Sequence, residues 1–200
     1  MIKAILFDLG GVLTNNSFDS VLKEITDNLG INFEDLKRIK EEYDQELLAG
    51  KLSVSDFNKI LKQRLNLNLS LEKITLTWEK SYRKVRIVNE KLYSFAKHLK
   101  KNYMIGMISN IYDLMAKIDK ERGIFEIFNT CILSCEVGLT KPNKEIFELS
   151  LRELNLESEE CIFIDDRGYH LIEPKKLGFK TILFQDNKQV VEELEKLLNN

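Results

Sequence analysis

The chain has few cysteines, almost no net charge and no long apolar run, and each of these shortages excludes a class of protein. Its three cysteines show no metal-type spacing, and an odd, unpatterned number suits a reducing compartment. The 30 basic residues nearly balance the 32 acidic ones and form no block, so we expect no nucleic-acid partner. No apolar run is long enough to span a bilayer, and an expected strand from residue 2 leaves no room for a signal peptide. We therefore expect a cytoplasmic protein without membrane contact.

The chain opens with an apolar run that ends in a carboxylate and two glycines. Residues 2–7 are typical of a short buried strand, and Asp8 falls where that strand should end. Gly10 and Gly11 allow a sharp turn and a close approach of the backbone to a ligand. In open α/β sheets, ligands bind just beyond the carboxyl ends of the strands, so we expect Asp8 at the opening of a site. Acidic residues at strand ends are common, and Asp8 alone is therefore unspecific.

Two later apolar runs also end in polar side chains, and a loop between them carries a lysine. These segments are 103–108 before Ser109 and Asn110, loop 138–142 with Lys141 and Pro142, and 161–164 before Asp165 and Asp166. We interpret Pro142 as the residue that opens the next helix. Each feature alone is unspecific, whereas the order Asp, Ser, Lys and Asp pair points to one shared site.

The apolar periodicity divides the chain into two parts. Residues 15–86 have few glycines and helix-period apolar positions, and we expect an all-helical insertion in which Ser53 or Ser55 caps a helix. Residues 1–14 and 87–200 alternate between strand and helix, with expected strands at Thr130–Cys135 and Lys180–Phe184. This alternation predicts an α/β fold with a doubly wound parallel sheet. A hydrophobic content of 44% suffices for one core with a modest insertion.

These motifs resemble those of the haloacid dehalogenase superfamily, whose members are mostly Mg²⁺-dependent phosphohydrolases. The matching stretches are Phe7-Asp8-Leu9-Gly10-Gly11-Val12-Leu13, Ile108-Ser109-Asn110, Lys141-Pro142 and Phe163-Ile164-Asp165-Asp166. The chain is most similar to the helical-cap branch with an Asp-x-Gly-x-Val first motif. The resemblance implies a Rossmann-like core (1–14 and 87–200) and an inserted cap (15–86) that closes over the site and selects a small phosphorylated substrate, such as a sugar phosphate.

The resemblance and the charge of a phosphate ester together suggest roles for the motif residues. Asp8 is the expected nucleophile, while Lys141, the Ser109 hydroxyl and the Asn110 backbone N–H bind the phosphoryl oxygens. Adjacent carboxylates repel each other without a cation, which favours a Mg²⁺ site. Its expected ligands are Asp8, the Gly10 carbonyl, Asp166, and Asp165 through a bound water.

Several departures keep other functions open. The commonest phosphatase pattern has a second aspartate at the position of Gly10, where it protonates the leaving group. Its absence leaves a 2-haloacid dehalogenase or a non-catalytic sensor as alternatives, although the intact Asp165-Asp166 pair favours a metal-dependent phosphatase. We interpret His170 as a surface or helix-start residue. Four cations of the expected cap could contact a substrate, but we place them on solvated helix faces: Arg38, Lys51, Arg64 and Arg83.

Overall fold

The computed structural model describes residues 1–15 and 18–199. Its centre is a five-stranded sheet in which all neighbouring strands run parallel, in the order β3-β2-β1-β4-β5. The strands are β1 (Ala4–Phe7), β2 (Met104–Ser109), β3 (Thr130–Leu133), β4 (Cys161–Asp165) and β5 (Lys180–Leu183). Phe7 pairs with Met107 on one side and with Ile164 on the other, so the three motif-bearing strands lie next to each other.

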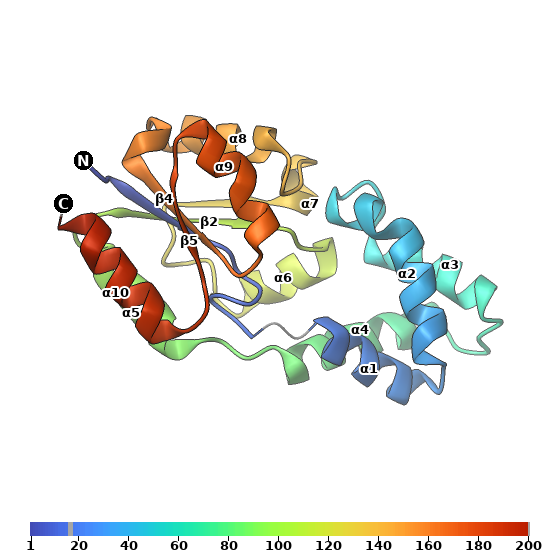
Figure 1. Ribbon diagram of the computed structural model, residues 1–200. Coiled ribbons are helices and arrows are strands. Elements are labelled where there is room, and N and C mark those ends of the chain that lie inside the picture. The colour runs from blue at the N-terminus through green and yellow to red at the C-terminus, as the bar shows by residue number, and fades with distance from the viewer. Residues whose placement is uncertain (16–17, 200) are drawn as a thin grey trace.

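Helices cover both faces of the sheet (Figure 1). They are α5 (Glu90–Leu99), α6 (Asp113–Glu121), α7 (Ser134–Val137), α8 (Lys144–Leu154), α9 (Ile172–Leu177) and α10 (Asn187–Leu198), with 3-10 turns η1 (Ser158–Glu160) and η2 (Gly168–Leu171). Alternate residues of β1 point to opposite faces, as strand geometry requires. Ile5 and Phe7 belong to the core that includes α5 and α10, whereas Leu6 belongs to the core on the α8 side. The predicted doubly wound α/β fold is confirmed.

Four further helices gather beyond the carboxyl ends of the strands (Figure 1), and we call them the helical unit. They are α1 (Phe18–Leu29), α2 (Phe33–Leu48), α3 (Val54–Arg64) and α4 (Leu71–Val85). Ser53 caps α3 as expected, because its side chain accepts the Asp56 N–H. Phe57 and Trp78 are fully buried and pack edge to face, with ring centroids 6.1 Å apart.

The chain leaves and re-enters the sheet through two segments that pair with each other. Thr14 forms an antiparallel bridge with Val88, and the Asn15 N–H donates to the Ile87 carbonyl at 2.9 Å. The Asn15 side chain accepts the Ile87 N–H and donates to the Val85 carbonyl. This pairing fixes the end of α4 relative to the start of the chain. Among the described residues, no helix has the length and apolar character that a membrane span needs.

Two local expectations were wrong. The strand expected at Thr130–Cys135 ends at Leu133, because its pairing with β2 ends where Ser109 meets Leu133. Cys135 lies in α7 and is only partly buried. Pro142 does not open α8, since that helix begins at Lys144 after Asn143.

Candidate active site

The sheet brings the motif residues together at its carboxyl edge. Asp8 directly follows β1, Ser109 ends β2 and Asp165 ends β4. Since Phe7 is level with Ile164, Asp8 is level with Asp165, and the Asp8 N–H donates to the Ile164 carbonyl at 2.8 Å. All three residues are buried, at exposures of 6% or less. The predicted meeting of these residues at one edge is what the structure shows.

Lys141 joins the two central carboxylates. Its Nζ donates to Asp8 Oδ1 and to Asp165 Oδ2, each at 2.7 Å, and the side chain is 1% exposed. Burial opposes the charge on Lys141, but the two carboxylates outweigh it and raise the lysine pKa. Burial likewise opposes ionisation of Asp165, yet Lys141 and His170 lower its pKa to about 2. A buried lysine is thus held in its charged form beside the expected nucleophile.

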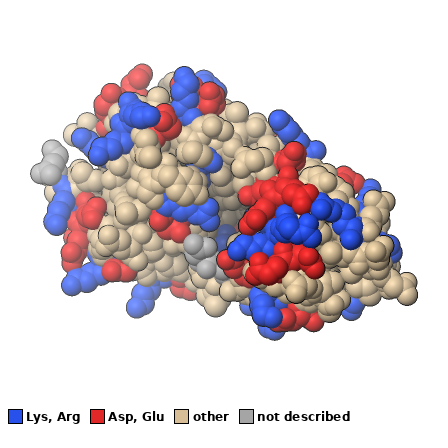
Figure 2. Space-filling view, turned by 45° about the vertical axis from the view of Figure 1, so that its right-hand side comes forward, with Lys and Arg blue, Asp and Glu red and all other residues tan. Residues whose placement is uncertain are grey.

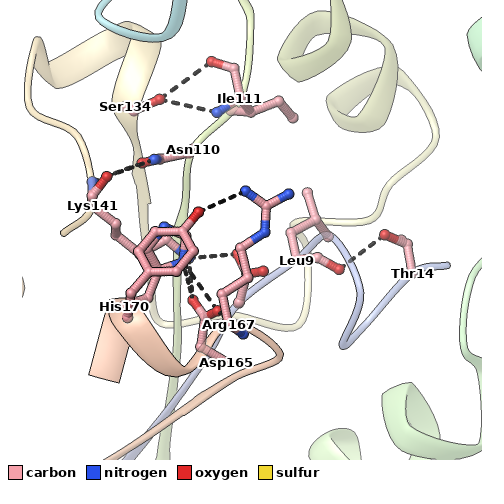
Figure 3. Close-up of polar contacts among 11 residues, drawn as sticks. Leu9, Thr14, Asn110, Ile111, Ser134, Lys141, Asp165, Arg167 and His170 are labelled. Atoms are coloured by element: carbon pink, nitrogen blue, oxygen red, sulfur yellow. Dashed lines mark hydrogen bonds and ion pairs between the residues drawn. The ribbon is translucent and has the colours of Figure 1, made fainter. Parts of the chain in front are cut away.

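The Asn110 side chain positions the loop that carries this lysine (Figure 3). Its Nδ2 donates to the Lys141 carbonyl at 2.9 Å, and its Oδ1 accepts the Lys141 N–H at 2.8 Å. Ser134 steadies the next residue of the same strand end, since its hydroxyl accepts the Ile111 N–H at 3.0 Å. Sequence reasoning gave Asn110 only a backbone role, because its side-chain partner lies 31 residues away.

Three carboxylates form a group suited to a divalent cation. Oxygens of Asp8, Asp165 and Asp166 lie within 4.8 Å of one another. Burial and then repulsion by Asp165 raise the pKa of Asp166, and burial raises the pKa of Asp8 despite the opposing effect of Lys141. Lys141 and Arg167 offset part of this repulsion, but they are two cations against three carboxylates. Carboxylate oxygens are the ligands that Mg²⁺ prefers, so the donor set fits that ion.

Gly11 supplies the space that this group needs. It has a φ of 92°, a backbone conformation that favours glycine. A Cβ added here would lie 2.2 Å from Asp166 Oδ2, far inside contact distance. The turn itself is closed by hydrogen bonds from Thr14 N and Oγ1 to the Leu9 carbonyl, both at 2.9 Å. The absence of a side chain at Gly11 is therefore a requirement of the carboxylate group.

His170 was expected at the surface or at a helix start. The surface position is wrong, because the residue is buried. It lies in η2 with 3% exposure, and its Nδ1 is 3.0 Å from Asp165 Oδ2. The Arg167 N–H also donates to Asp165, at 2.8 Å to Oδ1 (Figure 3). His170 and Arg167 thus fix the orientation of the Asp165 carboxylate, a contact that the five-residue spacing alone does not reveal.

A cavity of about 170 Å³ lies over these residues, between the sheet and the helical unit. Figure 2 shows a hollow in this region, with acidic and basic side chains around it. The lining residues include Asp8, Gly10, Ser109, Asn110, Lys141 and His170 from the core and Phe18, Lys40, Asp44 and Arg86 from the helical unit and the segment after it. The cations weighed from the sequence are not among them: Arg38, Lys51, Arg64 and Arg83. Arg38 and Arg83 instead form surface ion pairs with Asp35 and Glu121.

Comparison with known proteins agrees with this geometry. A family model described as haloacid dehalogenase-like hydrolase matches residues 2–178. A D-ribitol-5-phosphate phosphatase from Bacteroides thetaiotaomicron is 26% identical over 210 aligned positions, which cover 100% of both chains. A glyceraldehyde 3-phosphate phosphatase from Methanocaldococcus jannaschii is 30% identical, covering 91% of this chain and 84% of the relative.

The fold has solved counterparts as well. The crystal structure of a haloacid dehalogenase family enzyme from Bacteroides thetaiotaomicron, in complex with magnesium and inorganic phosphate, superposes with a TM-score of 0.80. It is 19% identical and covers 95% of this chain and 99% of its own. Because the family model matches residues 2–178, the chain belongs to the haloacid dehalogenase-like hydrolases, as its motifs predicted.

Proposed function

We propose that this hydrolase is a Mg²⁺-dependent phosphatase that acts on a small phosphorylated metabolite through an aspartyl-phosphate intermediate. The observation that carries the proposal is the buried Lys141 between Asp8 and Asp165, next to a three-carboxylate group, with Asp8 and Lys141 lining a cavity. Two relatives that align over most of the chain are phosphatases of a polyol phosphate and a triose phosphate. They support a substrate of similar size, such as a sugar or polyol phosphate.

Asp8 is the nucleophile in this proposal. Lys141 binds its Oδ1, so Oδ2 is the atom that attacks phosphorus in line with the departing oxygen. The attack gives an aspartyl-phosphate on Asp8, and water then hydrolyses it to inorganic phosphate and regenerates the carboxylate. Dividing the reaction into two displacements replaces one difficult step by two easier ones.

The phosphoryl oxygens are bound by donors at the ends of β2 and on the lysine loop. The Lys141 ammonium has three N–H bonds, and the carboxylates take two of them, so the third is available to a phosphoryl oxygen. Ser109 and Asn110 line the same cavity, where the Ser109 hydroxyl and the Asn110 backbone N–H would supply further donors. These groups offset the negative charge that otherwise repels an anionic nucleophile.

Mg²⁺, held by Asp8, Asp166, the Gly10 carbonyl and, through a bound water, Asp165, would neutralise further charge on the phosphoryl group. The helical unit would serve as a cap, with the core spanning residues 1–14 and 87–200 and the cap residues 15–86. The cap side of the cavity carries polar groups that suit a hydroxylated substrate. Lys40 Nζ is 3.0 Å from Asp44 Oδ1, and Asp44 also accepts a hydrogen bond from the Tyr112 hydroxyl of the core.

The test is turnover of p-nitrophenyl phosphate and of a panel of sugar, polyol and nucleotide phosphates, with Mg²⁺ or with EDTA. We expect activity only with a divalent cation and none in Asp8→Asn, because an amide is a poor nucleophile and a weaker Mg²⁺ ligand. Asp8→Asn should keep its circular dichroism spectrum, since the amide nearly matches the carboxylate in shape. Asp27→Asn is the matched control, as Asp27 is an exposed residue of α1 and should leave activity unchanged.

Three outcomes contradict the proposal. Native activity in Asp8→Asn would mean that another residue is the nucleophile. Turnover of 2-haloacids in EDTA, without phosphate release from any ester, would identify a dehalogenase. A rise in melting temperature with Mg²⁺ but no turnover of the whole panel would identify a non-catalytic binding protein.

A further inference from the structure

Arg86 occupies an unusual place beside the candidate active site. It follows α4 directly, and its side chain is 10% exposed and lines the cavity together with Asp8 and Gly10. A Cβ added to Gly10 would meet Arg86 Nη1 at 3.7 Å, with no other atom of residues 1–15 and 18–199 recorded within 4 Å. The guanidinium therefore lies next to the space that a side chain at position 10 would use.

The contacts of Arg86 within the protein use only part of its hydrogen-bonding capacity. Nη1 donates to the Asn15 carbonyl at a long 3.5 Å, and Nη2 is 3.7 Å from Asp119 Oδ2. Nε is buried and has no hydrogen-bond partner among the described residues. A guanidinium has five N–H donors, and burying such a charge is costly unless those donors are satisfied. An oxygen-rich ligand in the cavity that Arg86 lines would supply further acceptors for its guanidinium.

Arg86 belongs to a cluster of charged residues beside the cavity. Asp119 is fully buried, and its Oδ2 accepts a hydrogen bond from the Tyr82 hydroxyl at 2.6 Å. Arg122 also lies 3.7 Å from Asp119, so two arginines share one carboxylate. The Tyr82 ring, with its centroid 5.4 Å from the guanidinium carbon, helps to hold Arg86 in place. This cluster thus carries one excess positive charge and suits an anionic or oxygen-rich ligand group.

The direction of the displacement connects Arg86 to the departing oxygen. In-line attack by Asp8 sends the leaving group away from the sheet edge, toward the opposite wall of the cavity. Residues of the helical unit and Arg86 line the cavity together with Asp8, so they are the groups available to the departing oxygen. Position 10, two residues after the nucleophile, is where the commonest phosphatase pattern places the acid that protonates this oxygen. Here that position has no side chain, and Arg86 lies beside it.

We propose that Arg86 binds the departing oxygen and stabilises its negative charge, in place of the acid that Gly10 lacks; this inference rests on the proposed phosphatase function. As the bond between phosphorus and Asp8 Oδ2 forms, the bond to the ester oxygen breaks and its electron pair stays on that oxygen. A guanidinium remains protonated at neutral pH, so it stabilises the charge while water supplies the proton. The substrate class is a phosphate ester with further oxygen atoms near the ester bond, which the remaining N–H groups bind.

The experiment is the dependence of kcat/KM on leaving-group pKa for a series of aryl and alkyl phosphates at saturating Mg²⁺. For Arg86→Gln we expect a loss of about 10²-fold with alkyl phosphates and less than about 10-fold with p-nitrophenyl phosphate. The Brønsted line should therefore become steeper than that of the wild type. Arg86→Lys, which keeps the charge, should fall between the two. Arg83→Gln is the matched control, because Arg83 lies one turn earlier on the exposed surface of α4 and should keep the wild-type line.

Parallel Brønsted lines for the wild type and Arg86→Gln would overturn this inference and leave the phosphatase proposal intact, because a purely structural role lowers all rates together. Absence of wild-type turnover with every ester would instead refute the proposed function itself. Should Arg86→Gln be poorly folded, Arg86→Lys and Arg86→Ala still decide the matter. Added guanidinium at low millimolar concentration should restore alkyl phosphate turnover in Arg86→Ala, and failure of this rescue in a folded variant counts against the inference.

Discussion

The sharpest prediction concerns Gly11, because the structure gives both the reason for the glycine and a control for its replacement. In Gly11→Ala, the new Cβ would lie 2.2 Å from Asp166 Oδ2 and 2.5 Å from its Cγ. No contact of that length can persist, so the Asp166 carboxylate must move away from Asp8 and Asp165. We expect the variant to fold but to bind Mg²⁺ weakly.

The magnitude has two parts. A left-handed backbone costs a residue with a Cβ about 1–2 kcal/mol. For a chain of this size, 1 kcal/mol corresponds to about 2–4 °C in melting temperature. Strain alone should therefore lower the melting temperature by about 2–8 °C. Losing a group that orients metal ligands typically costs about 10–100-fold in metal affinity, and displacement of a ligand itself should cost at least that much.

Gly30→Ala separates the cost of backbone strain from the loss of Mg²⁺ affinity. Gly30 also has a positive φ, of 67°, but a Cβ there would meet no atom of the described part of the chain within 4 Å. It should therefore show the loss of stability without the loss of Mg²⁺ affinity. The assay is calorimetric titration with MgCl₂, together with melting temperatures across a range of Mg²⁺ concentrations. Equal Mg²⁺ affinity in Gly11→Ala and Gly30→Ala would show that Asp166 takes no part in metal binding.

Two further substitutions test the parts that surround the nucleophile. Asn110→Ala removes both hydrogen bonds to the Lys141 backbone, so it should destabilise the protein by about 1–3 kcal/mol and lower kcat. Unchanged kcat and melting temperature would show that the lysine loop is held by other contacts. Tyr112→Phe removes the hydroxyl that donates to Asp44 between the core and the helical unit, at a cost of about 1 kcal/mol in stability. It should raise KM for a polyol phosphate while kcat for p-nitrophenyl phosphate stays within about twofold. An equal change for both substrates would exclude a role in selecting the leaving group.

Features that depend on neighbouring residues were predictable from the sequence. A buried strand has a continuous apolar run, and its end is marked by the first polar residue, so Asp8, Ser109 and Asp165 could be placed at strand ends. Parallel strands have their carboxyl ends at one edge, which brings these residues together. The cap at Ser53 likewise follows from a local hydrogen bond to Asp56.

Features that depend on distant partners were not predictable. The run Thr130–Cys135 is mostly apolar and has no turn residue, but β3 ends where its partner β2 ends, and Ser134 bonds the Ile111 backbone instead. Arg83 and Arg86 are both cations near the end of α4 and look equivalent in the sequence. Only Arg86 reaches the cavity, because the pairing of Asn15 with Val85 and Ile87, about 70 residues away in the chain, directs the segment after α4.

The position of Arg86 changes the interpretation of the glycine at position 10. From the sequence, the glycine is a missing acid, and the loss of general acid catalysis typically costs about 10²–10⁴ in rate. In the structure, a carboxylate at this position would extend toward the Arg86 guanidinium, since the first atom of such a side chain would already lie 3.7 Å from Nη1. An adjacent guanidinium lowers the pKa of a carboxyl group, so an acid placed here would be ionised at neutral pH and unable to give a proton. It would also neutralise the charge that we assign to the departing oxygen. In our proposal, Arg86 beside a glycine takes the role that an aspartate at position 10 has in the commonest phosphatase pattern, and combining the two groups would weaken both.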